Sequence, residues 1–254
     1  MEYLTGKLCL ALLLKGAGVT LTLTALAMPL AVLLGLLLAW MRLSRHRWLA
    51  WPAAGYIEVI RGTPLLVQMF LIYYSLPQLG LWLDDGAAGL GAILGLQASA
   101  EFFKGLLTWP NFAVGVFCLA ANYAAYEAEI LRAGLEAVDK GQREAALSIG
   151  LSERQAFYLI VLPQAFRIVV PPLINDLIAM LKDSCLVSVI AVQELLNIAV
   201  GVGRSKFNMP QMMIAAAVLY LIMSLVCYAL GKYLEKRLKV QGAHELHVDQ
   251  VHGH

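Results

Sequence analysis

The feature that most constrains this chain is its long runs of residues without any charge. Residues 16–41 and 207–231 each contain no Asp, Glu, Lys or Arg. About 20 apolar residues in a helix are enough to cross the hydrocarbon core of a bilayer. Hydrophobic residues make up 60% of the sequence and charged ones 14%, with a mean hydropathy of +0.72. A soluble domain of this length needs more charge to cover its surface, so we expect a protein that crosses a membrane several times.

We predict an all-α membrane domain over residues 1–240 with about five transmembrane helices. A further apolar stretch, residues 86–100, is short and rich in glycine, which favours an interfacial or re-entrant segment. Residues 139–162 form the most polar connection between two of the expected spans. The expected spans are 16–41, 56–79, 105–134, 163–181 and 207–231.

The distribution of basic residues indicates an orientation. If the N-terminus lies outside, twelve of the 19 Lys and Arg residues fall in or beside cytoplasmic segments and five fall outside. Arg61 and Lys182 lie within spans. Because cytoplasmic loops are enriched in Lys and Arg, we expect the C-terminus and residues 139–162 in the cytoplasm.

Cysteine and histidine give little sign of a metal site. The four cysteines stand singly in apolar runs, which favours small buried side chains over disulfides or metal ligands. Four of the five histidines lie in the polar tail 241–254. His244 and His247 could share a metal if the tail were helical, but nothing apolar pins this segment, so we expect a flexible cytoplasmic tail and no metal.

The polar segment 139–162 has the signals of two short helices joined by a turn. Asp139 suits a helix start, and Gly150 permits the left-handed turn that ends it. Ser152 and Gln155 fit a capping box, and Pro163 begins the next span. Such a segment can be an ordinary amphipathic connector, but its residues are more specific than that.

The sequence resembles the permease subunits of ABC importers for polar amino acids, the histidine, arginine, glutamine and glutamate type. Glu144–Ala145–Ala146, Gly150 and Val161–Leu162–Pro163 match the family's EAA loop, with Val161 in place of the usual isoleucine. The resemblance covers about residues 16–238 and includes the stretches 56–77, 124–142 and 162–192. Several separated motifs in the same order are far more specific than one short pattern.

The resemblance implies a multi-pass protein of the bacterial cytoplasmic membrane whose loop helix docks on a separate ATPase. The chain has no GxxxxGK[ST] phosphate loop, so we expect no enzyme activity and no cofactor on this chain, with ATP and Mg bound by the partner. Expected partners are a like or sister permease, two ATP-binding subunits, an external amino-acid-binding protein, a polar amino acid and lipid, but no nucleic acid. The expected coupling residues are Arg143, Glu144, Ala145, Ala146, Gly150, Leu162 and Pro163.

Charged and polar groups at membrane depth are candidates for the substrate pathway, because burying them there is costly. Glu58 with Arg61 and Glu129 with Arg132 are spaced to pair on one helix face, although such pairs can also serve only as anchors. The sequence Gly62–Thr63–Pro64 predicts a helix break of the kind that lines cavities in transporters. The candidate pathway residues are Arg61, Thr63, Pro64, Gln68, Tyr126, Glu127, Glu129, Arg132, Asp176, Lys182, Asp183 and Ser184.

The identity of the substrate stays open. Lys182 and the serine hydroxyls suit a carboxylate, whereas Asp176, Asp183 or Glu127 suits an ammonium or a cationic side chain; Lys182 and Asp183 can also lie simply at the outer interface. Glu127 departs from the small or neutral residue usual in the family, which weakly favours a cationic or neutral substrate over a dicarboxylic one. Two alternatives remain: an ion-coupled transporter or channel without an ATPase, and a membrane metalloenzyme that uses the histidine tail.

Overall fold

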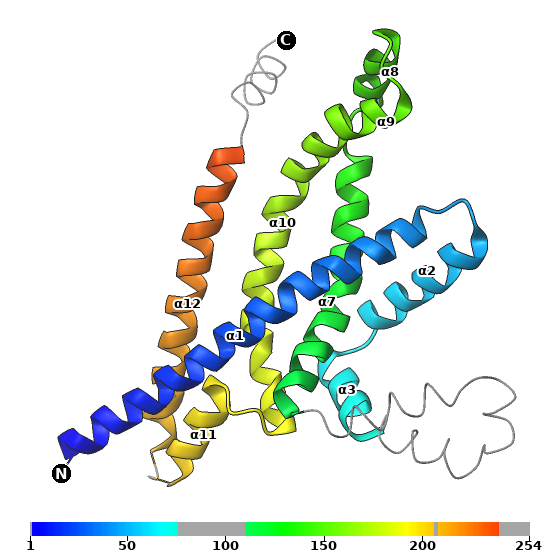
Figure 1. Cartoon of the computed structure of the whole chain (residues 1–254). Helices are drawn as coiled ribbons and strands as arrows, with labels where there is room; N and C mark the ends of the chain where they lie inside the picture. Colours follow the sequence, from blue (N-terminus) through cyan, green and yellow to red (C-terminus); the bar gives the residue numbers. More distant parts are fainter. Residues whose placement is uncertain (1, 76–109, 206–207, 239–254) are drawn as a thin grey trace, which may run out of the picture.

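The structure is a computed structural model that describes residues 2–75, 110–205 and 208–238, and every regular element in these ranges is a helix (Figure 1). The predicted all-α class is therefore confirmed. The predicted segment 86–100, residues 76–79 and 105–109 at the ends of two expected spans, residue 207 and the tail 241–254 lie outside the described residues.

In the described ranges, three helices are long and apolar enough to cross a membrane: Lys7–Arg42, Glu153–Ile190 and Met209–Leu238. A bent pair, Arg47–Arg61 with Leu65–Ser75, makes a fourth span if it is counted as one. The remaining expected span lies in α7 (Asn111–Glu136), whose second half carries several charged and polar residues. These residues lower its hydropathy, and the helix is instead largely covered by its neighbours.

The first helix, α1 (Glu2–Arg42), contains the whole first expected span and crosses the other helices obliquely (Figure 1). It packs along α7 more extensively than any other two described elements pack together. Gly35 permits this contact, because a Cβ at that position would lie 2.7 Å from the Cβ of Glu127. On the opposite side, leucines such as Leu33 and Leu36 are exposed, as expected for a surface that faces lipid.

The second expected span differs most from its prediction. Its helix, α2 (Arg47–Arg61), begins well before Tyr56, and the exposed Trp48 and Trp51 in its first turns are typical of the edge of a membrane. The chain then breaks at Gly62–Pro64 and continues as α3 (Leu65–Phe70) and the π-helical turn η1 (Leu71–Ser75), at an angle of 109° to α2. The predicted break is confirmed, and the angle shows that it redirects the chain sharply.

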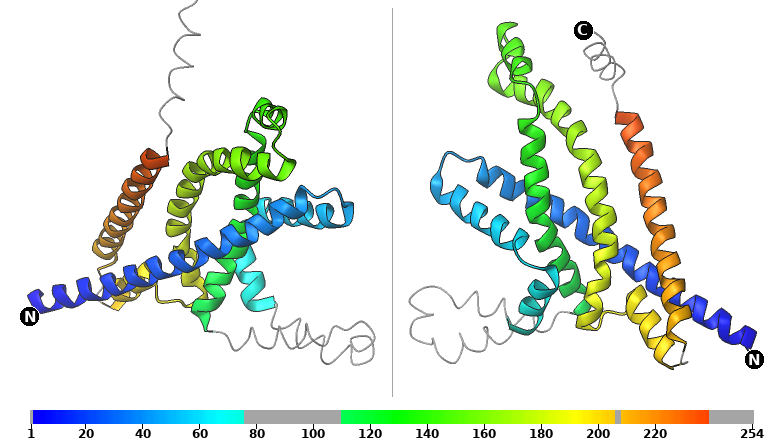
Figure 2. Two further views of the ribbon diagram at one scale, coloured as in Figure 1. Left: turned by 45° about the horizontal axis from the view of Figure 1, so that its top comes forward. Right: turned by 180° about the vertical axis from the view of Figure 1, so that it is seen from behind.

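The fourth span is part of a long, nearly continuous helical segment. It comprises α9 (Glu153–Ala156), the π-helical turn η2 (Phe157–Val161) and α10 (Leu162–Asp183), and ends in the 3₁₀ turn η3 (Ser184–Ile190). Pro163 lies in the first turn of α10, directly after the π-helical turn η2, and the helical segment continues through it. Figure 2 shows α10 beside α7 from two further directions.

Two more helices follow in the described part of the chain. The first, α11 (Leu195–Ser205), is short and was not predicted, and it leads into α12 (Met209–Leu238). Buried Glu194 stabilises the start of α11: its carboxylate accepts hydrogen bonds from the amides of Leu196 and Asn197 and from the hydroxyl of Tyr220. Glu194 therefore ties α11 to α12.

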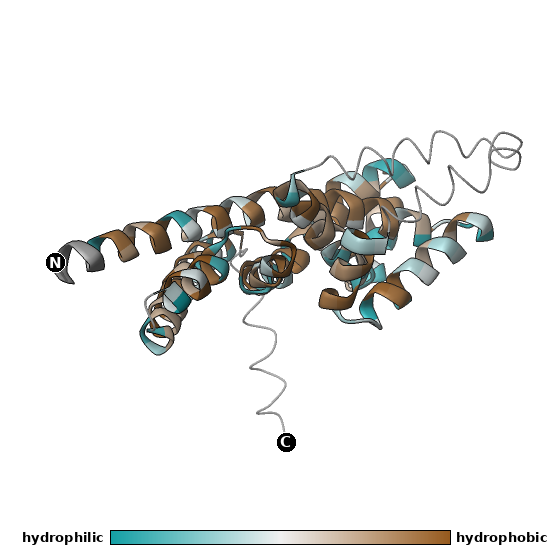
Figure 3. Cartoon of the chain, turned by 90° about the horizontal axis from the view of Figure 1, so that it is seen from below, coloured by the Kyte–Doolittle hydropathy of each residue, from teal (hydrophilic) through white to brown (hydrophobic). Residues whose placement is uncertain are grey.

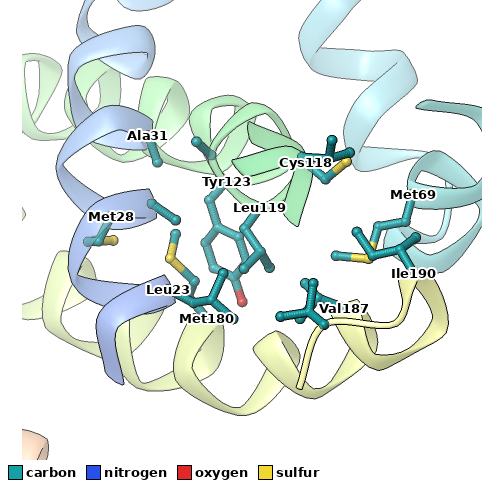
Figure 4. Packing of buried hydrophobic residues seen from close by; sticks show 14 residues of the cluster. Leu23, Met28, Ala31, Met69, Cys118, Leu119, Tyr123, Met180, Val187 and Ile190 are labelled. Carbon is teal, nitrogen blue, oxygen red and sulfur yellow. The ribbon is translucent and has the colours of Figure 1, made fainter. Parts of the chain in front are cut away.

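The main core lies where α1, α3, α7, α10 and η3 meet. In Figure 4, the side chains of Leu23, Leu119 and Met180 converge there from α1, α7 and α10. Hydrophobic residues predominate along the long helices (Figure 3), and many of their large apolar side chains are exposed. Full burial of one such core side chain contributes about 1.5–3 kcal/mol. The core thus fixes the helices that surround the cavity described next.

Candidate functional site

A cavity of about 310 Å³ opens between the break after α2, the middle of α7 and the second half of α10. Polar side chains dominate its wall, which is unusual at the centre of a membrane domain. The lining residues are Thr63, Pro64, Leu65, Asn122, Tyr123, Tyr126, Asp176, Ala179 and Asp183. The cavity is large enough for a small polar molecule.

The helix break forms one wall of the cavity, and hydrogen bonds from Gln68 stabilise its backbone. The side-chain amide of Gln68 donates 2.8 Å hydrogen bonds to the carbonyl of Ile60 and to the hydroxyl of Thr63. Its oxygen accepts a 2.8 Å hydrogen bond from the amide of Asn122 on α7. Pro64 removes an amide at this point, so carbonyls at the end of α2 need another donor. Gln68 provides it and fixes the break against α7.

The two charged residues of the wall are both acidic and both lie on α10. Asp183 accepts a 2.8 Å hydrogen bond from the hydroxyl of Tyr123 across the cavity. Asp176 lies nearly two turns earlier on the same helix. Among the lining residues that belong to the described part of the chain there is no Lys, Arg or His. The cavity therefore carries negative charge.

Glu127 lies on α7 close to this acidic wall. Its side chain is fully buried, and neither carboxylate oxygen has a hydrogen-bond partner in the described parts of the chain. It is close enough to Asp176 for the two carboxyl groups to interact electrostatically. Buried charged groups are normally paired, so Glu127 is an exception that needs an explanation.

The predicted ion pairs have different outcomes. Arg132 and Glu129 form the expected pair, with 2.8 Å between Nη2 and Oε2. The expected pair of Glu58 with Arg61 is wrong: Glu58 lies 3.9 Å from Arg42 instead. Because α1 ends beside α2 and α7, its last residue, Arg42, reaches both Glu58 and Glu129. These residues form a separate cluster near the ends of the helices.

Arg61 instead lies beside the cavity. Its guanidinium carbon is 5.6 Å from the ring centroid of Tyr126, which lines the cavity. This is a cation–π distance and places a positive charge behind an aromatic wall residue. Arg61 itself is exposed.

The structure brings some of the predicted pathway residues together and separates others. Thr63, Pro64, Tyr126, Asp176 and Asp183 line one cavity, and Gln68 supports it. Three kinds of exception are clear in the described residues. Lys182 is exposed and outside the lining. Ser184 is buried, and its hydroxyl donates a hydrogen bond to the carbonyl of Leu181. Glu129 and Arg132 belong to the ion cluster.

Besides the apolar Leu65 and Ala179, the sequence analysis missed two polar lining residues, Asn122 and Tyr123. Both lie in the first, apolar half of α7, one turn before Tyr126. An asparagine within an apolar membrane helix is costly unless it has a partner. That cost was the available signal for Asn122.

The polar segment 139–162 forms a loop that projects beyond the ends of α7 and α10 (Figures 1 and 2). It contains α8 (Lys140–Ser148), capped by Asp139, whose carboxylate accepts a 2.6 Å hydrogen bond from the amide of Gly141. Gly150 has a φ of +89°, the left-handed conformation that was predicted. The capping box of Ser152 and Gln155 is also present. The second expected helix, however, continues through η2 into α10.

An ion pair holds the two arms of this loop together. The guanidinium of Arg143 on α8 donates to both carboxylate oxygens of Glu153 on α9, at 2.7–3.0 Å. The tip between the arms presents Ile149, which is 79% exposed. Glu144 and Ala145 are exposed too, whereas Ala146 is buried. A fixed turn with an apolar tip and an adjacent charge is suited to contact with another protein.

Comparison with known proteins identifies the family of this chain. The model of a family described as "binding-protein-dependent transport system inner membrane component" matches residues 31–240. The chain belongs to this family. The permease is 37% identical over 235 residues to a probable amino-acid ABC transporter permease of Sinorhizobium fredii, covering 92% of this chain and 90% of the relative. It is 33% identical to the arginine transport system permease ArtQ of Bacillus subtilis, covering 89% and 92% respectively.

Solved structures agree with these relatives. A crystal structure of an amino acid ABC transporter with histidines is 37% identical to the permease, with a TM-score of 0.78, and covers 93% of this chain and 99% of that one. A chain of the MetNI methionine transporter in an inward-facing conformation shares the fold, with a TM-score of 0.67 at 17% identity. The predicted resemblance is thereby confirmed: this chain is an amino-acid ABC transporter permease, a multi-pass membrane protein and a transport component.

Proposed function

We propose that the permease forms the translocation pathway for a polar or charged amino acid and moves it by alternating access, driven by ATPase subunits that dock on the loop 139–162. The cavity is the binding site for the substrate. Its size, its polar wall and its position between three membrane elements support this role.

The observation that carries the proposal is that α7 and α10 bear both the cavity and the loop. The helix α7 ends at Glu136 and α8 begins at Lys140, so only residues 137–139 separate this cavity helix from the first helix of the loop. On the other side, α9 continues through η2 into α10. A displacement of the loop is therefore transmitted to both cavity helices, because helical segments transmit movement with little loss.

The contacts of the loop suit an ATPase as the source of this displacement. The sequence contains no phosphate-binding loop, so ATP and Mg would be bound by the partner. Ile149 would enter an apolar cleft of that partner, and Glu144 would make a polar contact beside it. Ala145 and Ala146 allow close approach, Gly150 sets the turn, and Arg143, Leu162 and Pro163 connect this surface to α9 and α10.

The complete importer would contain a second permease, two ATPase subunits and an external amino-acid-binding protein. The excess of basic residues near the loop and near Lys236 and Arg237 supports a cytoplasmic C-terminus and an external N-terminus. With ATP bound, the ATPases would hold the cavity open to the outside, and hydrolysis would open it inward. The cavity would thus face one side at a time.

Purification in mild detergent tests the proposal. The permease should co-purify with an ATP-binding subunit, and amino acids should stimulate the ATPase activity of the complex. Glu144→Lys should leave membrane insertion intact but abolish this stimulation, whereas Glu235→Lys on α12, the same charge change far from the loop, should not. Normal stimulation in Glu144→Lys would contradict docking at this residue, and uptake by the isolated chain in an ion gradient would favour a secondary transporter.

A further inference from the structure

We propose that the turn between α1 and α2 binds the headgroup of an anionic phospholipid. In this arrangement Arg45 and Arg47 hold the phosphate, and Trp48 and Trp51 lie where the headgroup meets the acyl chains. The inference depends neither on the docking of an ATPase nor on which amino acid is carried, because it concerns a surface of the permease that faces the bilayer.

Basic residues gather at this turn without acidic neighbours. Residues 43–57 contain Arg45, His46 and Arg47 but no Asp or Glu. Arg45 and Arg47 are exposed, and neither side chain forms an ion pair or a hydrogen bond with a residue in the described ranges. A guanidinium group can donate two parallel hydrogen bonds to a phosphate. Two unpaired arginines this close together therefore suit a phosphate anion.

Arg42 differs from these two arginines. Its guanidinium lies 3.1 Å from Oε1 of Glu129 on α7 and 3.9 Å from Oε1 of Glu58 on α2, so acidic residues of the protein neutralise it. These contacts fasten the end of α1 to both neighbouring helices. They also place the turn beside the end of α7, which leads into the loop 139–162. Arg45 and Arg47 thus follow a fixed helix end on the same side of the membrane as this loop.

Two exposed tryptophans follow the arginines directly. Trp48 and Trp51 are 72% and 74% exposed, and because they are three residues apart they share one face of α2. On the buried face of this helix, Ile57 packs with Ala39 of α1 and Ala125 of α7. Tryptophan is enriched at the level of the lipid headgroups, since its ring is apolar and its N–H is polar. The exposed face of α2 therefore places the arginines beside the headgroups.

The combination of charge and exposed rings favours a lipid over other anions. The turn lies at the periphery of the described helices (Figures 1 and 2), where lipid has access to it. A soluble anion would contact the arginines but would leave both indole rings uncovered, whereas a phospholipid covers them with its chains. An anionic headgroup is preferred to a zwitterionic one, because the cation of a zwitterionic headgroup is repelled by the arginines.

Quenching of tryptophan fluorescence by lipids with brominated acyl chains tests the proposal. The full-length permease is reconstituted in mixed bilayers of phosphatidylglycerol and phosphatidylcholine, with one of the two lipids brominated. Replacing the other three tryptophans, Trp40, Trp82 and Trp109, by phenylalanine leaves a signal from Trp48 and Trp51 alone. We expect phosphatidylglycerol to be preferred beside these two residues by about fivefold or more.

Variants of the turn assign this preference to the arginines. Combining Arg45→Gln with Arg47→Gln should reduce the preference to about twofold or less, whereas combining Arg45→Lys with Arg47→Lys should keep most of it, because the charge remains. The matched control combines Lys236→Gln with Arg237→Gln, the same charge change at the exposed end of α12, and should leave the preference unchanged.

Three results would overturn the inference: no preference for phosphatidylglycerol, an unchanged preference in the glutamine variant of the turn, or an equal loss in the control, which would indicate a general attraction to basic surfaces. Glycerol 3-phosphate, which carries the phosphate without chains, should not reduce the preference; if it did, a soluble anion and not a lipid would occupy the turn. If the double glutamine variant does not insert, Arg45→Gln and Arg47→Gln decide separately: a lower preference in each supports the site, and retention in both overturns it.

Discussion

The hydroxyl of Tyr123 on α7 donates a 2.8 Å hydrogen bond to Oδ2 of Asp183 at the end of α10. Both residues line the cavity, and the bond joins the two helices that also carry the loop 139–162. Any movement that separates α7 from α10 at this level must break it. The bond therefore links the state of the cavity to the relative position of these helices.

Removing this bond should weaken the described conformation. Tyr123→Phe keeps the ring but leaves Asp183 without its donor, and a hydrogen bond to a charged group contributes about 1.5–3 kcal/mol. We expect a lower melting temperature for the purified protein and altered amino-acid-stimulated ATPase activity. Tyr228→Phe, an exposed position on α12, is the matched control and should change neither. An unchanged melting temperature in Tyr123→Phe would show that the bond does not stabilise this state.

The turn at Gly150 should tolerate only residues that accept a positive φ. Its φ of +89° lies in a region that β-branched side chains rarely adopt, although no atom would obstruct a Cβ there. Gly150→Val should thus reorient α8 relative to α9 and reduce stimulated ATPase activity at least tenfold, whereas Gly150→Asn should retain most of it. Equal loss in both variants would indicate that size rather than backbone conformation matters.

The pair of Arg143 and Glu153 should matter for coupling more than for stability. Both side chains are more than half exposed, so solvent screening limits the contribution of the pair to about 0–1 kcal/mol. Arg143→Glu and Glu153→Arg should each reduce stimulated ATPase activity several-fold, since each places like charges across the loop. The double charge reversal should restore most of that activity. Failure of the double variant to recover would mean that Arg143 contacts the ATPase directly.

The buried carboxyl of Glu194 should make the start of α11 sensitive to pH. Burial raises the pKa of Glu194 above its ordinary value of 4.5, against hydrogen bonds from Leu196, Tyr220 and Asn197 that lower it. Because the folded-state pKa is higher, the contribution of Glu194 to stability is fully present below about pH 4.5 and declines as the pH rises through the folded-state value.

Glu194→Gln removes this titration, so the melting temperature of the variant minus that of the wild type should increase from pH 4.5 to pH 8. Comparing the two proteins at each pH cancels the titration of all other groups. A difference that stays constant, or that decreases with pH, would contradict the raised pKa.

The sequence predicted those parts of the structure that depend on local signals. The cap at Asp139, the left-handed Gly150 and the box of Ser152 with Gln155 each follow from the chemistry of one or two neighbouring residues. The break at Gly62–Pro64 is of the same kind, since proline alone removes the amide. The membrane class followed from composition.

Features that depend on distant residues were not predictable in the same way. Spacing on one helix paired Glu58 with Arg61, but the end of α1 brings Arg42 to Glu58 and leaves Arg61 for Tyr126. Ser184 and Lys182 looked like pathway residues because they adjoin Asp183, yet neither is among the described residues that line the cavity. The helix α11 was missed because a loop glutamate, Glu194, and Tyr220 of another helix stabilise it.

The most direct test of the central claim is amino-acid uptake into proteoliposomes that contain the permease with its ATPase and external binding protein. The account predicts that uptake requires ATP on the side of the membrane where the loop 139–162 lies. It also predicts that uptake is lost in Glu144→Lys and Gly150→Val, and that an ion gradient alone does not drive it. Uptake by the permease alone in an ion gradient, or ATP-driven uptake unchanged in both loop variants, would contradict the account.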